Sequence, residues 1–290
     1  PETTRKPLRA RMAPAFLLTP GLLILALLFI WAMVQLFAYS FYSFTEGRLV
    51  KDWSLSSWER FFTDRFYWQI LWRTARLGVS VTVISLLIGY PVAYALTRIT
   101  RRAVLVPAYI IIFSPLLVSV VVRSYGWMLV LSDTGVVNDI LTQLPFIENP
   151  IRLVFNETGV IIALVHILLP FAVFPMVSVL TQLPPNLKEA AMDLGANRLQ
   201  TFYQVILPLS LPGIIAAAQI VFTLTVSSFV TPALLGGGRV LVLSRLIYDN
   251  IAELNWPLAA VEAFVLLAMA LVILFAFSRL NRAIYAARES

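Results

Sequence analysis

The sequence contains no cysteine and a single histidine, His166. Without cysteine the chain forms no disulfide, thiolate metal site or cysteine nucleophile, and one histidine excludes a histidine-based metal cluster. The chain also lacks the G-x-x-x-x-G-K-[ST] pattern that cradles nucleotide phosphates, the H-E-x-x-H zinc motif and the G-x-S-x-G nucleophile elbow. These absences predict that the chain is not an enzyme and holds no metal or cofactor of its own.

Charged residues are also scarce, at 13% of the 290 residues, whereas 60% are hydrophobic and the mean hydropathy is +0.85. Soluble domains are nearer half apolar and a quarter charged. The composition therefore excludes a soluble enzyme, a nucleic-acid-binding protein and a disordered tail, and it predicts a polytopic membrane protein. The sequence pI near 9.9 then reflects membrane topology rather than binding to nucleic acid.

Six apolar stretches are long enough to cross a bilayer, which takes about 20 residues per helix. The first of them is too long for the apolar core of a signal peptide, which has about 7–15 residues. We therefore expect an all-α membrane protein with six transmembrane helices, forming a single domain over residues 1–290. The expected spans are 15–39, 77–96, 104–131, 159–180, 211–235 and 257–277.

Six spans place both termini on the same side of the membrane. The loops on that side carry slightly more Lys and Arg than the opposite loops, so the termini are expected in the cytoplasm. The outer connections are then 40–72, 132–158 and 236–256. The first is rich in aromatic residues, which is typical of an interfacial belt and leaves docking of a partner as the alternative.

Ionisable residues within the spans are few: Arg123, His166 and Glu262. A carrier driven by protons or sodium ions usually has more buried acids and an inverted repeat. If the protein moves a solute uphill, the energy is therefore expected to come from another chain.

The segment 181–208, between the fourth and fifth spans, has the pattern of two short helices. Pro185 suits a first helical turn, where its missing N–H would have no partner, and Gly195 suits a helix end. Asn197, followed three residues later by Gln200, predicts the N-cap of a second helix.

In the first of these helices four small or apolar residues follow the spacing i, i+3, i+4 and i+7, which places them on one face. They are Leu187, Ala190, Ala191 and Leu194. An apolar face outside the membrane indicates that another protein packs on it, or that the helix lies in the membrane surface.

This segment resembles the EAA signature of bacterial ABC importer permeases, in which E-A-A is followed by G and, ten residues later, by [IV]-x-L-P. The matching residues are Glu189, Ala190, Ala191, Gly195, Val205, Leu207 and Pro208. The resemblance implies a type I ABC importer fold in a bacterial inner membrane. It also implies a cytoplasmic coupling-helix loop over 181–208 that docks into the ATPase subunit through these residues and Asp193, with Glu189 at the ATPase surface and Gly195 at the bend.

In that family the permease pairs with a second permease, identical or different, with two ATPase subunits that bind ATP and magnesium, and with a periplasmic solute-binding protein. Further segments resemble the spermidine/putrescine subgroup: 115–119, 122–127, 135–138, 229–237 and 255–259. The resemblance implies a small organic amine as solute. Polyamine members often carry an acid where this chain has Ala233, so an opine or an amino-acid derivative stays open.

Several polar residues within the spans are candidates for the substrate path. Arg123 and Glu262 lie at comparable depths, and we hypothesise that they pair. Tyr125 and Trp127 are two residues apart on a helix, so at most one of them shares the face of Arg123. The most polar stretch of the fifth span is expected to line the path or to bond across helices; it comprises Ser227, Ser228 and Thr231.

Two other classes of function stay open. A self-sufficient carrier or channel would transport solute in liposomes without ATP. A membrane scaffold without transport activity would tolerate substitution of the polar stretch in the fifth span.

Overall fold

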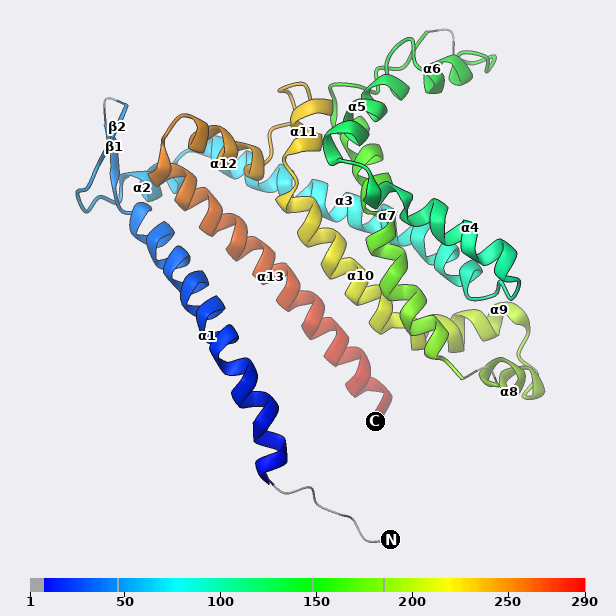
Figure 1. The fold of residues 1–290 in the computed structure, drawn as a ribbon. Coiled ribbons are helices and arrows are strands. Elements are labelled where there is room, and N and C mark those ends of the chain that lie inside the picture. Colours follow the sequence, from blue (N-terminus) through cyan, green and yellow to red (C-terminus); the bar gives the residue numbers. More distant parts are fainter. Residues whose placement is uncertain (1–7, 46, 148, 185, 290) are drawn as a thin grey trace. The chain divides into compact units, whose positions relative to one another are not determined.

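The computed structural model describes residues 8–45, 47–147, 149–184 and 186–289, with only the backbone for 8–18 and 280–289. The chain forms two compact units. One comprises Pro1–Thr63 and Asn250–Val261, and the other comprises Asp64–Asp249 and Glu262–Ser290. Figure 1 shows that helices make up most of the described chain, which confirms the all-α prediction. The single domain over 1–290 stays a prediction.

The first unit contains α1 (Leu8–Tyr39), whose stretch Thr19–Tyr39 is strongly apolar and ends where the first predicted span ends. A hairpin of β1 (Ser43–Thr45) and β2 (Arg48–Val50) follows. Asp52 closes the hairpin, since its Oδ1 accepts from the Ser43 hydroxyl at 2.6 Å, and this bond holds the pKa of Asp52 below its usual range. Helix α2 (Ser56–Thr63) completes the outer connection.

The core of the second unit consists of α3 (Arg65–Leu96), α7 (Glu157–Gln182) and α10 (Leu207–Ser227). Glycine allows these helices to approach closely, as small residues do in membranes. A Cβ on Gly78 of α3 would lie 2.7 Å from a ring carbon of Phe222 on α10, and one on Gly213 of α10 would lie 3.0 Å from the Pro175 carbonyl of α7.

The third predicted span is divided into two helices. The chain forms α4 (Arg102–Phe113), the 3₁₀ turn η1 (Ser114–Leu117) and α5 (Val120–Val130), with a bend of 104° between the two halves. Pro115 lacks an N–H and occupies the first turn of η1, and Val118 is extended, so the helical hydrogen bonds stop there.

The fifth predicted span is also interrupted. Helix α10 ends at Ser227, Ser228 is extended, and α11 (Val230–Leu235) follows. The shorter helices α6 (Val136–Leu141) and α12 (Leu243–Ala252) lie in the outer connections, and α13 (Trp256–Glu289) is the last helix of the described chain.

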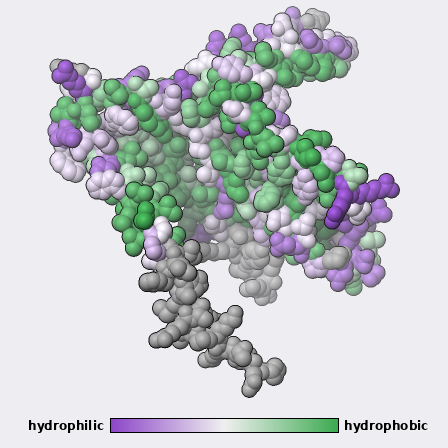
Figure 2. All heavy atoms as spheres, viewed as in Figure 1, coloured by the Kyte–Doolittle hydropathy of each residue, from purple (hydrophilic) through white to green (hydrophobic). Residues whose placement is uncertain are grey.

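In the part of the chain that is described, five helices are long and apolar enough to cross a membrane, and the number is six when the bent α4–α5 pair is counted as one span. This agrees with the six predicted spans. Figure 2 shows hydrophobic residues along the spanning helices of the second unit, and hydrophilic residues gathered near α6 and near α8 and α9.

Candidate functional site

The loop between α7 and α10 begins with α8 (Leu187–Asp193), whose end has a Schellman motif. The N–H of Gly195 donates to the Met192 carbonyl at 2.9 Å, and the N–H of Ala196 donates to the Ala191 carbonyl at 3.0 Å. Gly195 has a φ of +86°, which a side chain rarely adopts. The helix end predicted at Gly195 is confirmed, whereas Pro185 lies outside the described residues.

The second short helix, α9 (Arg198–Thr201), begins with the predicted N-cap pair. The Asn197 Oδ1 accepts from the Gln200 N–H at 2.9 Å, and the Gln200 Oε1 accepts from the Asn197 N–H at 2.8 Å. A π-helical turn, η2 (Phe202–Ile206), then leads into α10, which has Pro208 in its first turn. The loop is therefore two capped helices joined by a sharp bend at Gly195.

The apolar side chains that this loop exposes differ from the predicted face. The relative exposure is 90% for Leu194, 66% for Leu199, 59% for Tyr203 and 45% for Met192. Leu194 is the C-cap residue of α8 and its N–H donates to the Ala190 carbonyl at 3.2 Å, whereas Leu187 is partly buried, so the predicted face is exposed only in part. The loop still presents apolar groups outside the spans, and Glu189, Ala190 and Asp193 are exposed beside them.

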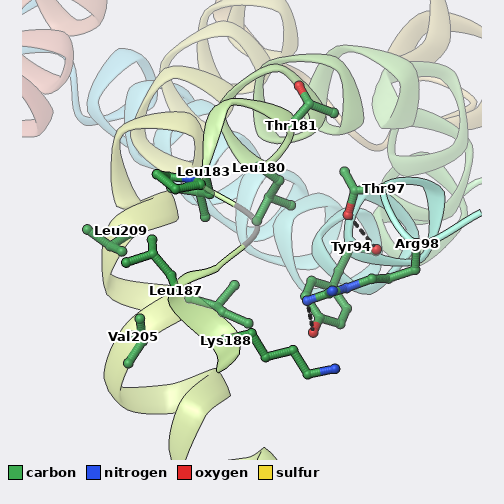
Figure 3. Close-up of a pocket in the computed structure, with 12 residues that line it drawn as sticks. Tyr94, Thr97, Arg98, Leu180, Thr181, Leu183, Leu187, Lys188, Val205 and Leu209 are labelled. Atoms are coloured by element: carbon green, nitrogen blue, oxygen red, sulfur yellow. Dashed lines mark hydrogen bonds between the residues drawn. The ribbon is translucent and has the colours of Figure 1, made fainter. Parts of the chain in front are cut away.

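A hollow of about 360 Å³ lies between this loop and the ends of α3, α7 and α10. Figure 3 shows Tyr94, Thr97 and Arg98 on one side of the hollow and Leu187, Val205 and Leu209 on the other. Nη2 of Arg98 donates to the Tyr94 hydroxyl at 2.9 Å, and the guanidinium carbon lies 4.8 Å from the centre of the Tyr94 ring. The start of α8 therefore borders the hollow through Leu187 and Lys188.

The other end of the loop is firmly attached to the core. The Phe202 ring packs edge-to-face against Tyr90 and Tyr94 of α3, with ring centres 5.9 and 5.5 Å apart. The Tyr90 hydroxyl also hydrogen-bonds the Ser210 hydroxyl of α10 at 2.9 Å. Phe202 therefore joins the end of the loop to α3, and Tyr90 joins α3 to α10.

At the far end of the second unit, α5 packs against α7 and α11 (Figure 1). Trp127 of α5 donates from Nε1 to Nδ1 of His166 on α7 at 3.1 Å, so His166 bonds between the two helices. Trp127 shares a hollow with Arg123, whereas Tyr125 is 48% exposed and is not among its lining residues. This agrees with the expectation that only one of the two aromatic residues shares the face of Arg123.

The hypothesis that Arg123 pairs with Glu262 was wrong for this structure. Nε and Nη1 of Arg123 are buried and have no hydrogen-bond partner among the residues described. The estimate of comparable depth counted residues along the third predicted span, whereas the chain bends by 104° before α5. Glu262 is fully buried, at 0% exposure.

The polar residues of the fifth predicted span differ in their hydrogen bonds: one bonds to α5 and the others do not. Thr231 is fully buried, and its hydroxyl bonds the Ser124 hydroxyl of α5 at 3.0 Å, so it holds α11 against α5. Ser227 is exposed and donates to the Thr223 carbonyl of its own helix, and the Ser228 carbonyl accepts from the Ser244 hydroxyl. A role of Ser227 in a substrate path stays a prediction.

Comparison with known proteins identifies the family. Residues 10–286 match the family described as the binding-protein-dependent transport system inner membrane component. The chain belongs to this family. The match covers almost the whole permease, including the capped loop and the bent span.

Two relatives are both named spermidine/putrescine transport system permease protein PotB. The spermidine/putrescine transport system permease protein PotB of Haemophilus influenzae is 32% identical over 268 residues, which cover 92% of this permease and 89% of that protein. The PotB protein of Escherichia coli K12 is 34% identical over 220 residues, covering 76% and 80% of the two chains.

Solved structures show the same fold. A chain in the crystal structure of a bacterial alginate ABC transporter, in complex with an alginate pentasaccharide-bound periplasmic protein, has a TM-score of 0.72 and 19% identity. The match covers 96% of this permease and 98% of that chain. This level of identity supports the type I importer fold alone.

Sequence reasoning missed several residues of the permease that the structure brings together. Tyr90 and Tyr94 are one turn apart on α3, and with Phe202 they form the aromatic contact that attaches the loop. Their i, i+4 spacing near the end of a span was the available signal. Ser124, the partner of Thr231, gave no signal, because it is one of three serines in an apolar span.

Proposed function

We propose that this permease is the transmembrane subunit of an ATP-driven importer in a bacterial inner membrane, with both termini in the cytoplasm. It works with a second permease, two ATPase subunits and a periplasmic solute-binding protein. Its solute is a small organic amine, a polyamine such as spermidine or putrescine. The family membership, the names of the PotB relatives and the mild excess of Lys and Arg on the termini's side support this proposal.

The observation that carries the proposal is the loop with α8 and α9. Two capped helices present exposed Leu194, Leu199 and Tyr203 at the end of the bundle, where an ATPase subunit buries them. Movement of that subunit shifts α8 over the hollow beside it, and Phe202 transmits the shift to α3 and α10. The spans then open the solute path to alternate sides of the membrane.

Replacement of Glu189 tests this coupling. Glu189 is an exposed acid in the first turn of α8, where it stabilises the helix and faces the proposed ATPase surface. In proteoliposomes containing the whole complex, Glu189→Ala should lower amine uptake at least tenfold and remove the stimulation of ATP hydrolysis by the solute-binding protein. The control Glu59→Ala, an exposed acid on α2, should leave both rates unchanged.

Normal uptake by the Glu189→Ala complex would contradict the coupling role. Uptake of an opine or amino-acid derivative, but not of spermidine or putrescine, would keep the permease role and change the solute. Transport by the purified permease alone, without ATP, would replace the proposal with a self-sufficient carrier.

A further inference from the structure

Arg123 presents buried hydrogen-bond donors that have no acceptor. Its Nε and Nη1 atoms are shielded from solvent and lack a partner in the part of the chain that the structure describes. Arg123 is also the fourth residue of α5, so its charge lies near the positive end of that helix dipole. A cation in a membrane span without an acceptor is strongly unfavourable, so the complete assembly is expected to supply one.

The guanidinium borders an open hollow of about 200 Å³ between α5 and α7, whose other lining residues are Gly126, Trp127, Val130 and His166. Because Nδ1 of His166 accepts from Trp127, the neutral imidazole carries its proton on Nε2 and is a donor there. The free polar groups of Arg123 and His166 are thus all donors, and the remaining lining is apolar. The group that complements such a hollow is an acceptor, and a carboxylate also neutralises the guanidinium charge.

We propose that a carboxylate on a membrane helix of the second permease subunit occupies this hollow and pairs with Arg123. The inference rests on the proposed function, which includes that subunit and an amine solute. A protonated amine is the wrong occupant, since it has the same charge as Arg123 and offers donors only.

The surface around the hollow suits a neighbouring helix. Val122 is 60% exposed and Leu129 is 69% exposed on α5. Between them, a Cβ on Gly126 would meet nothing within 4 Å, so a helix backbone has room to approach closely.

Photo-cross-linking in the full complex tests which molecule occupies the hollow. Benzoylphenylalanine replaces Val130 at the rim, and in a control chain it replaces Val272, which is 67% exposed on α13. We expect irradiation of the first chain to link the two permeases through a peptide that contains Asp or Glu, with at least fivefold less of that product from the control. Products with lipid only, or equal yields at both positions, would overturn the proposal.

Substitution of Arg123 tests the charge. Arg123→Gln should reduce co-purification of the second permease at least threefold, and Arg123→Lys should give an intermediate value. Arg123→Glu combined with Arg at the cross-linked acid should restore assembly. If Arg123→Gln assembles fully and only raises the KM for solute, Arg123 binds the solute and the proposal is overturned.

Uptake of spermidine by the unsubstituted complex is measured in the same membranes. Its absence would defeat the proposed solute, whereas the cross-link reports on the second permease independently of transport. The two proposals therefore fail by different observations.

Discussion

At the residue scale, Gly195 illustrates how one backbone angle fixes the shape of the loop. Its positive φ ends α8 and allows two consecutive carbonyls of that helix to be satisfied. An added Cβ would meet nothing within 4 Å, so a side chain at this position is disfavoured by the backbone angle and not by a clash. Substitutions at Gly195 can therefore separate the effect of the backbone angle from the effect of side-chain size.

Gly195→Ala and Gly195→Asn form a matched pair for that test. Alanine at positive φ costs about 1 kcal/mol, whereas asparagine tolerates this region better. We expect uptake by the reconstituted complex to fall for Gly195→Ala and to fall less for Gly195→Asn, although Asn is the larger residue. If the two variants ranked in order of side-chain size, surface contact rather than the backbone angle would be the cause.

At the element scale, helices α3, α7 and α10 depend on small residues for their packing. Gly78→Ala would place a methyl group 2.7 Å from Phe222 and 2.9 Å from Val226. Overpacking of this kind costs about 1–3 kcal/mol, so the Tm of the purified complex should fall. Gly21→Ala on α1 is the control, since its Cβ would meet nothing within 4 Å, and it should leave the Tm unchanged or slightly raise it. An unchanged Tm for Gly78→Ala would contradict the packing described for α3 and α10.

The aromatic contact between the loop and α3 leads to a second prediction at this scale. Phe202→Ala removes the ring that contacts Tyr90 and Tyr94, so ATP hydrolysis should continue while uptake per ATP falls several-fold. Tyr90→Phe keeps the ring and loses one hydroxyl bond, worth about 1 kcal/mol, so its effect should be small. The Ser210 hydroxyl still donates to the Leu207 carbonyl after that change. Measuring both rates in one preparation distinguishes lost coupling from lost stability, and equal uptake per ATP in all three chains would contradict transmission through the rings.

The elements that the sequence predicted well are those with local causes. The bend at Gly195 and the cap pair of Asn197 and Gln200 follow from residues close together in the chain. The breaks before α5 and after α10 could not be predicted from hydropathy, because the residues on both sides of each break are largely apolar. The partner of Arg123 was wrongly predicted for the same reason, since its direction depends on the bend.

At the scale of the whole molecule, the absence of cysteine makes the orientation directly measurable. A single cysteine in place of Lys188 should react with an impermeant maleimide only in inside-out vesicles, because α8 is expected in the cytoplasm. A single cysteine in place of Arg48, in the β1–β2 hairpin, should react only in intact spheroplasts. The opposite pattern would reverse the orientation and move α8 away from any cytoplasmic ATPase.

The account of the whole molecule depends on an ATPase subunit holding α8 and α9. The direct measurement is photo-cross-linking from Leu194, which is 90% exposed beside the bend. In intact bacteria expressing the complete complex, the account predicts a product that joins the permease to the ATPase subunit and changes in yield when ATP is depleted. A product with lipid alone, or no product with the ATPase subunit in either state, would contradict it.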